Sequence, residues 1–173
     1  LAAAAAVPAA AAVAQADDPH LWLEEIEGER AIAQVKQWNA ETEAQLTEMR
    51  GFEERRARAL KLLNDPNQIA TPSEVMGDLV ANHWVDANHK RGLWRVSPLA
   101  DYLAGKPVWR TLIDVDALGK AEGKSWVWHG ASCLPPEYQR CLVSLSPGGR
   151  DAEVVREVDL ASGKFVEGGF THP

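Results

Sequence analysis

The chain is divided by the stretch Asp17-Asp18-Pro19-His20-Leu21-Trp22-Leu23-Glu24-Glu25, which continues through Gly28-Glu29 to Trp38-Asn39. Residues 1–16, before it, carry no charge and are nearly all Ala and Val. After Asp65, short apolar runs alternate with turn-forming residues, a pattern typical of strands. The stretch therefore separates an uncharged leader from a helical region, and the helical region from a β-rich one.

The leader, residues 1–16, is typical of the end of a secretory signal peptide. It ends in two small-x-small sites, Ala12-Val13-Ala14 and Ala14-Gln15-Ala16, so we expect cleavage just before Gln15 or Asp17. It is shorter than the ~20 residues that a membrane-spanning helix needs, and no membrane partner is expected. The alternative is an Ala-rich helix of the mature protein. The signal-peptide interpretation predicts an exported protein, periplasmic or secreted.

Residues 17–66 are expected to form a helical segment. From Gly28 onward the spacing predicts an amphipathic helix of about five turns. Its recurring positions are Ile32, Val35, Trp38, Thr42, Leu46 and Met49. Gly51 interrupts the pattern, a shorter helix follows over residues 52–63, and Asn64-Asp65-Pro66-Asn67 ends it because proline lacks a backbone N–H. We expect the two helices to pack as an antiparallel pair with one apolar seam.

Residues 67–173 are expected to form an antiparallel β-meander without further helices. Short strands joined by tight turns fit a sandwich, a barrel or a propeller, and the phrase from Leu145 to Lys164 is similar to the inner hairpin of a propeller blade. We expect no closing strand at the chain end and therefore an incomplete sheet system. The predicted strands are residues 79–86, 93–96, 108–115, 125–129, 141–146, 154–160 and 165–166.

The charge balance excludes one class of partner. The net charge is -7, whereas nucleic-acid binding needs clustered Lys and Arg. The only basic cluster, residues 55–58, follows Glu53-Glu54 and is typical of a solvated helix face. With 46% hydrophobic and 25% charged residues the composition is globular, and the seven Trp indicate bulky packing in layers.

No catalytic constellation can be identified in the sequence. A Gly-x-Ser-x-Gly elbow is absent, and Ser146 precedes a hairpin turn instead. The pair Glu24-Glu25 points to opposite sides of an extended segment and makes a poor acid/base dyad. No Gly-rich phosphate loop is present. We therefore predict no catalytic residue, no substrate-binding residue and no cofactor.

A metal site is the other chemistry considered. His83, Asp86 and His89 lie close in sequence, but on a strand the two histidines would stand about 20 Å apart at ~3.3 Å per residue unless the turn brings them together. We favour a structural or surface role and predict no metal ligand.

The two cysteines, Cys133 and Cys141, bracket a proline-stiffened segment between two strands. In an exported protein an even count favours a disulfide. The alternative is two buried free thiols, since Cys141 fits the inward face of its strand. A catalytic thiol is disfavoured because no His lies nearby in sequence.

The order of several phrases resembles one protein family. The segment from Asp18 to Glu25, with the Gly28-Glu29 helix and Trp38-Asn39, is similar to the N-terminal segment of the prolyl oligopeptidase family of serine peptidases. Further phrases resemble the opening blades of its propeller, in the exported bacterial branch. They are Gly92-Leu93-Trp94-Arg95, residues 112–118, Trp126-Val127-Trp128-His129-Gly130 and residues 142–149.

The resemblance implies an α+β fragment: an N-terminal helical pair followed by an antiparallel β-meander, the opening blades of an incomplete seven-bladed β-propeller. It implies that residues 17–66 pack on a hydrolase domain that this chain lacks, and that residues 67–173 are part of the propeller. The parent enzyme would cleave short peptides after proline with a Ser, Asp and His triad, none of which matches a position here. The alternative is a non-enzymatic periplasmic β-rich binding or interaction module with a helical arm.

Overall fold

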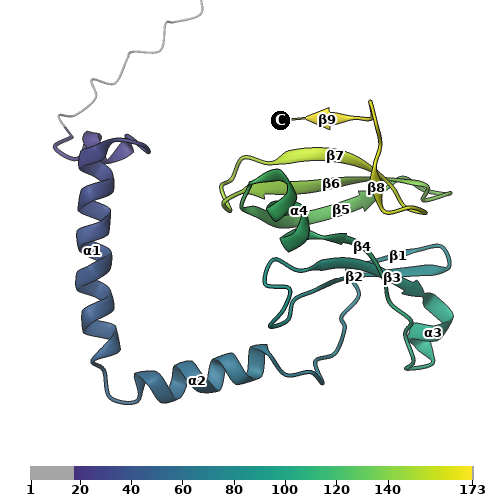
Figure 1. Cartoon of the computed structure of the whole chain (residues 1–173), viewed down its shortest axis with the longest axis horizontal. Coiled ribbons are helices and arrows are strands. Elements are labelled where there is room, and N and C mark those ends of the chain that lie inside the picture. The colour runs from purple at the N-terminus through teal and green to yellow at the C-terminus, as the bar shows by residue number, and fades with distance from the viewer. Residues whose placement is uncertain (1–17, 173) are drawn as a thin grey trace, which may run out of the picture. The chain divides into compact units, whose positions relative to one another are not determined.

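The computed structural model describes residues 18–172 (Figure 1). The predicted signal-peptide remnant, residues 1–16, lies outside the described residues. The chain divides into two compact units, the first ending at Arg58 and the second beginning at Ala59. This division falls inside a helix, so the predicted antiparallel pairing of the two helices stays a prediction.

The helical region begins with the 3-10 helix η1 (Leu21–Glu24) and continues with α1 (Glu29–Thr47). The indole N–H of Trp22 donates to the carbonyl oxygen of Pro19 at 3.1 Å, and the Arg30 guanidinium lies 3.9 Å from the centre of the Trp22 ring. These contacts fold the opening stretch onto the first turn of α1. Helix α2 (Phe52–Leu63) follows Gly51, which has a φ of 78° and interrupts the helical backbone, so both predicted helices are confirmed.

The first sheet is a four-stranded antiparallel meander in the order β1-β2-β3-β4. Its strands are β1 (Glu74–Met76), β2 (Leu79–Trp84), β3 (Leu93–Pro98) and β4 (Arg110–Asp114). The predicted hairpin turn at residues 88–92 is confirmed, since Trp84 pairs with Leu93 on its far side. A bulge between Trp94 and Arg95 shifts the register between β3 and β4.

The second sheet has five strands, with β5-β6-β7-β8 in order and β9 beside β7. Its strands are β5 (Trp126–Cys133), β6 (Arg140–Pro147), β7 (Val154–Asp159), β8 (Lys164–Phe165) and β9 (Thr171–His172). The expected strands did not include β9, in which Thr171 and His172 pair with Arg156 and Val155. The two sheets are not joined into a closed system, as expected.

The core lies between the two sheets, which Figure 1 shows stacked on one another. Trp94 of β3 packs against Trp128 of β5, with ring centres 5.6 Å apart. In β6, alternate side chains at Cys141, Val143 and Leu145 are at most 1% exposed, which confirms the predicted inward face. Apolar burial of this kind stabilises by about 25 cal/mol per Å² and fixes the register of each strand.

The expectation of no helix after Asp65 is wrong. Two short helices occur, α3 (Leu99–Leu103) and α4 (Val115–Glu122). The Asp114 carboxylate accepts the Ala117 N–H and begins α4, and Gly123, with a φ of 64°, ends it. Because of these caps, Val115, the last residue of the predicted strand 108–115, begins a helix instead. None of the helices in residues 18–172 combines the length and apolarity that a bilayer crossing requires.

Candidate functional site

Ser146 is part of a turn and is not exposed to a substrate. It is fully buried, and its hydroxyl donates to the carbonyl oxygen of Arg150 at 2.6 Å. This bond closes the turn between β6 and β7. The hydroxyl thus has a structural role in this turn.

The Asp86 carboxylate accepts hydrogen bonds from groups in and beside the β2–β3 turn. It accepts the backbone N–H groups of Asn88 and His89, both at 2.8 Å, the indole N–H of Trp84 at 2.9 Å and a contact from His89 Nδ1 at 3.0 Å. Partial burial raises the pKa of Asp86, but these hydrogen bonds outweigh it and hold the pKa at about 2. The carboxylate therefore fastens the turn.

The His83 side chain points toward the second sheet, where it meets Trp128 of β5. Its ring stacks on Trp128 with centres 5.4 Å apart and planes 7° apart, and Nε2 donates to the carbonyl oxygen of Arg91 at 3.2 Å. Burial lowers the pKa of His83 and favours the neutral ring. Among residues 18–172, no group of three or more His, Cys, Asp or Glu side chains is placed to hold a metal ion.

Cys133 and Cys141 lie directly opposite each other at the end of the β5–β6 hairpin, and a disulfide joins them with their Cα atoms 3.9 Å apart. Both side chains are buried. The bond ties the ends of the loop of residues 134–139, which includes the cis peptide bond Pro135–Pro136.

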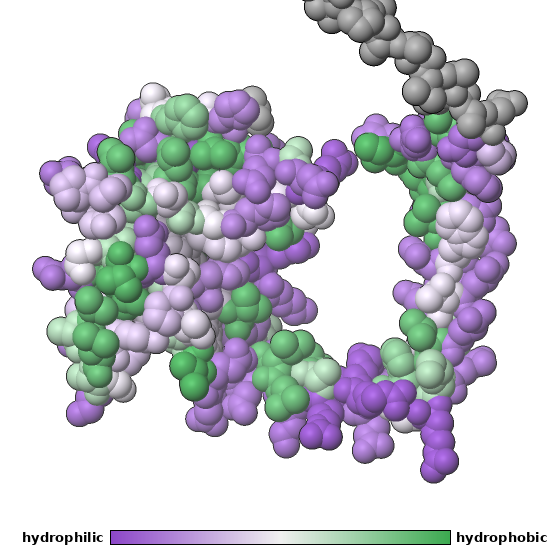
Figure 2. All heavy atoms as spheres, turned by 180° about the vertical axis from the view of Figure 1, so that it is seen from behind, coloured by the Kyte–Doolittle hydropathy of each residue, from purple (hydrophilic) through white to green (hydrophobic). Residues whose placement is uncertain are grey.

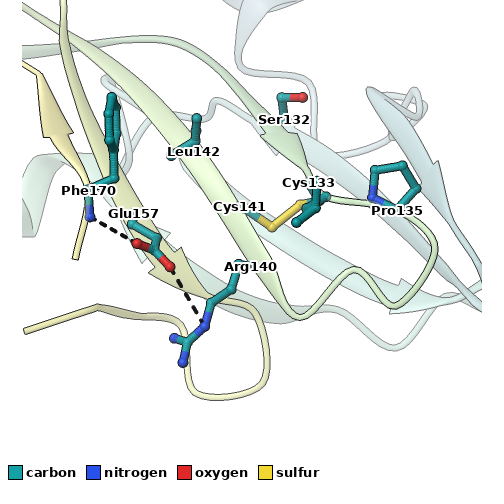
Figure 3. A pocket seen from close by; sticks show the side chains of 9 residues that line it. Ser132, Cys133, Pro135, Arg140, Cys141, Leu142, Glu157 and Phe170 are labelled. Atoms are coloured by element: carbon teal, nitrogen blue, oxygen red, sulfur yellow. Dashed lines mark hydrogen bonds and ion pairs between the residues drawn. A yellow bond between two sulfur atoms is a disulfide. The ribbon is translucent and has the colours of Figure 1, made fainter.

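A pocket of about 370 Å³ lies beside this loop, on the face of the second sheet that points away from the core (Figure 3). Leu142 and Phe170, 40% and 52% exposed, give it an apolar lining. Glu157 accepts the backbone N–H of Phe170 at 2.9 Å and lies 3.8 Å from Arg140 Nε, so the rim is polar. An apolar floor with a polar rim suits packing against another protein surface.

The helical unit has a second exposed apolar surface. Ile32, Val35 and Trp38 recur along α1 and are 38%, 45% and 47% exposed. Figure 2 shows apolar side chains along this helix at the molecular surface. Ala31 is the only side chain of α1 that is buried in the described residues. The stripe is therefore open to a partner.

Two consecutive antiparallel meanders, stacked face to face, have the arrangement of neighbouring blades in a β-propeller. The comparison with protein families gives the same class. The model of the prolyl oligopeptidase N-terminal β-propeller domain matches residues 5–172, and the chain belongs to this family.

Relatives and solved structures agree with this assignment. An uncharacterized peptidase of Sinorhizobium fredii is 46% identical over 158 residues, which is 91% of this chain and 22% of that protein. An uncharacterized peptidase of Rickettsia prowazekii is 32% identical, over 86% of this chain and 20% of that protein.

The structure of a post-proline cleaving enzyme from Rickettsia typhi superposes with a TM-score of 0.77 at 33% identity, over 86% of this chain and 21% of that one. A prolyl endopeptidase structure, at 17% identity and a TM-score of 0.64, shares the fold. The chain thus spans about a fifth of the length of these proteins, and the resemblance read from the phrases is confirmed.

The sequence did not indicate the pocket. Leu142 and Phe170 come from separate strands and loops, and no spacing along the chain brings them together. The signal that could have drawn attention to the pocket is the outward position of Leu142, an apolar residue alternating with the buried Cys141 and Val143.

Proposed function

We propose that this chain is the non-catalytic N-terminal part of a larger serine peptidase that hydrolyses short peptides after proline. Its sheets would contribute to the propeller that restricts access to the active site. The observation that carries the proposal is the family match over residues 5–172 together with coverage of only about a fifth of each relative. The name of the Rickettsia typhi enzyme supports the post-proline specificity.

In this proposal the partner of α1 is the hydrolase domain of the longer protein. The exposed stripe of Ile32, Val35 and Trp38 supports it, because burying one such side chain contributes about 1.5–3 kcal/mol. The pocket beside Leu142 and Phe170 offers a second packing surface.

The first test is an activity assay of the 173-residue chain. With a fluorogenic Gly-Pro peptide and a fluorophosphonate probe for activated serines, we expect neither cleavage nor labelling. Cleavage or labelling of the chain itself would contradict the non-catalytic role.

The second test grafts residues 18–172 into the Rickettsia typhi enzyme in place of its matching segment. We expect the chimaera to cleave the Gly-Pro peptide. Trp38→Glu places a charge on the α1 stripe and should reduce activity or stability, whereas Ala40→Glu adds the same charge elsewhere on the helix. Equal effects of the two variants would argue against docking through Trp38.

Export to the periplasm or the medium belongs to the same proposal. Its supports are the uncharged run of residues 1–16 and the disulfide between Cys133 and Cys141, which oxidising compartments favour. Fusing a basic leader and residues 1–18 to alkaline phosphatase should give phosphatase activity outside the cytoplasm. A Val7→Asp, Val13→Asp variant of the same fusion should abolish it, and retained activity would argue against a signal peptide.

A further inference from the structure

His83 lies where the two sheets meet. Its ring stacks on Trp128 of β5 with centres 5.4 Å apart and planes 7° apart, and Trp128 also meets Trp94 of β3. His83 and Trp94 face each other across β2 and β3. A histidine and a tryptophan of the first sheet therefore hold the same tryptophan of the second sheet, and we call this contact of three rings the joint.

The backbone of the β2–β3 turn fixes one edge of the His83 ring. Its Nε2 donates to the carbonyl oxygen of Arg91 at 3.2 Å. The next residue is Gly92, and a side chain there would collide with Nε2 of His83. The ring thus has one face on Trp128 and its donor edge against the backbone of Arg91 and Gly92.

The other ring nitrogen, Nδ1, is the one that a proton can reach. Because Nε2 carries the hydrogen that it donates, the neutral ring has its free lone pair at Nδ1. Nδ1 has no hydrogen-bond partner among residues 18–172, and in the same range no buried side-chain nitrogen or oxygen lacks a partner. Nδ1 is therefore in contact with solvent, and protonation of His83 does not require the sheets to separate.

The charged side chains on the elements around His83 are engaged elsewhere. The Arg91 guanidinium donates to Ser125 Oγ at 3.0 Å, and Asp116 at the start of α4 accepts the backbone N–H of Arg91 at 2.8 Å. None of the ion pairs among residues 18–172 includes His83. The remaining charged or titratable groups of these elements are Asp86 paired with His89, His129 paired with Glu153, Asp114 bonded to the Ala117 N–H, Arg95 over Trp84 and Trp109, Lys124 over Trp126, and the exposed Lys90.

The joint therefore favours the neutral form of the histidine. Burial lowers the pKa of His83, and the hydrogen bond to the Arg91 carbonyl oxygen opposes this only in part. The face of Trp128 attracts a cation as well, but the centre distance of 5.4 Å is near the ~6 Å limit of that attraction and keeps it weak.

We propose that His83 makes the joint between the two sheets sensitive to acid: the neutral ring packs on Trp128, and protonation at Nδ1 weakens this contact and destabilises the pair of sheets. The stabilisation is complete above the unfolded pKa of about 6.5 and is lost as the pH falls through the lower pKa of the folded state. This inference goes beyond the proposed function, because it concerns only the two sheets of this chain.

The first measurement is an NMR titration of the 173-residue chain from pH 8 to pH 4, which includes the range in which histidine changes charge. Long-range ¹H–¹⁵N spectra report the protonation of the His83 ring nitrogens, and the same signals in the urea-unfolded chain give the reference. We expect His83 to take up its proton at a lower pH in the folded chain than in the unfolded chain. Nuclear Overhauser effects between the His83 and Trp128 rings should weaken over the same step. Proton uptake at the same or a higher pH, or undiminished Overhauser effects after protonation, would overturn the proposal.

The second measurement compares urea unfolding at pH 8 and pH 5. His83→Phe keeps a flat ring against Trp128 but cannot titrate, and His172→Phe is the matched control at an exposed position of β9. Between the two pH values the unfolding constant of the parent should rise at least about threefold more than that of His83→Phe, and His172→Phe should follow the parent. The same pH dependence in His83→Phe and the parent would contradict the proposal. If His83→Phe does not fold, His83→Gln, which keeps a donor for the Arg91 carbonyl oxygen, replaces it in the same comparison.

Discussion

Replacing Asp86 by asparagine should destabilise the chain and remove part of its sensitivity to acid. The Asp86 carboxylate accepts two backbone N–H groups, one indole N–H and a histidine contact, so it holds the β2–β3 turn and the Trp84 ring together. Asparagine has nearly the same shape, but it carries no charge and one of its two terminal groups is a donor. At least one of these bonds is therefore lost in Asp86→Asn.

The magnitude follows from the pKa. Hydrogen bonding holds the pKa of Asp86 at about 2, against an ordinary value of 3.8. At about 1.4 kcal/mol per tenfold change, this lowering corresponds to at most about 2.5 kcal/mol of stability. Because the Asp86 side chain is 31% exposed, solvent screening reduces the figure, and we expect about 1–2 kcal/mol.

The direction of the pH dependence follows from the pKa of Asp86, which is lower in the folded state than in the unfolded state. Its stabilisation is complete above the unfolded pKa of about 4 and is lost as the pH falls through the folded value of about 2. The parent chain should therefore lose about 1–2 kcal/mol more than Asp86→Asn between pH 5 and pH 2. The other carboxylates are common to both chains and cancel in the difference.

Urea unfolding followed by tryptophan fluorescence at several pH values measures this difference. Hydrogen exchange at the Asn88 and His89 amides gives a local readout, and both should lose protection in the variant. Asp78→Asn is the matched control, because the Asp78 side chain is exposed. If Asp86→Asn matched the parent within 0.5 kcal/mol at pH 7 and kept the same pH dependence, the turn would not depend on this carboxylate.

Two further perturbations test the second sheet. Replacing both Cys133 and Cys141 by alanine should cost about 2–3 kcal/mol in urea unfolding, the loop-closure estimate for so short a loop; an unchanged midpoint would contradict a stabilising bond. Gly163→Ala should cost about 2–4 kcal/mol, because φ is 69° and the new Cβ would lie 2.8 Å from the Leu112 carbonyl oxygen. Gly168→Ala has a similar φ of 66° but open space, so it should cost only about 1–2 kcal/mol; equal losses would show that the contact with Leu112 is unimportant.

Strand alternation and helix periodicity predicted most of the fold because they report which side chains are buried. The inward set of β6 is an example, with Leu142 left outside. Helix α4 could not be predicted in this way, since its eight residues are too few for a 3.6-residue period to stand out. It begins because Asp114 caps it, which is a local event inside a stretch that otherwise alternates like a strand.

The contacts of Arg95 on the first sheet were beyond prediction for a different reason. Its guanidinium carbon lies 4.3 Å from the centre of the Trp84 ring and 4.5 Å from that of Trp109, and its Nε donates to Asn82 Oδ1 at 2.8 Å. Asn82 faces Arg95 directly across β2 and β3, whereas Trp109 reaches it only after the bulge between Trp94 and Arg95 has shifted the register. A one-residue shift moves every later side chain to the other face of the sheet. The tryptophans were taken as packing residues, which holds for the buried Trp94 and Trp126 but not for Trp38, which is 47% exposed. The sequence does not say which tryptophans meet a cation.

Several aspartates of this chain hold its turns. Asp65, Asp86, Asp114 and Asp159 each accept a backbone N–H two or three residues later, and Asp18 does the same ahead of η1. Each hydrogen bond stabilises the conformation of a turn or of a helix start. Part of the net charge of -7 therefore has a structural role, because these carboxylates lie where the chain turns or changes from strand to helix. The hydrogen bonds lower the pKa of Asp86 and of Asp159, so we expect acid to loosen these two turns before the buried faces of β3 and β6 separate.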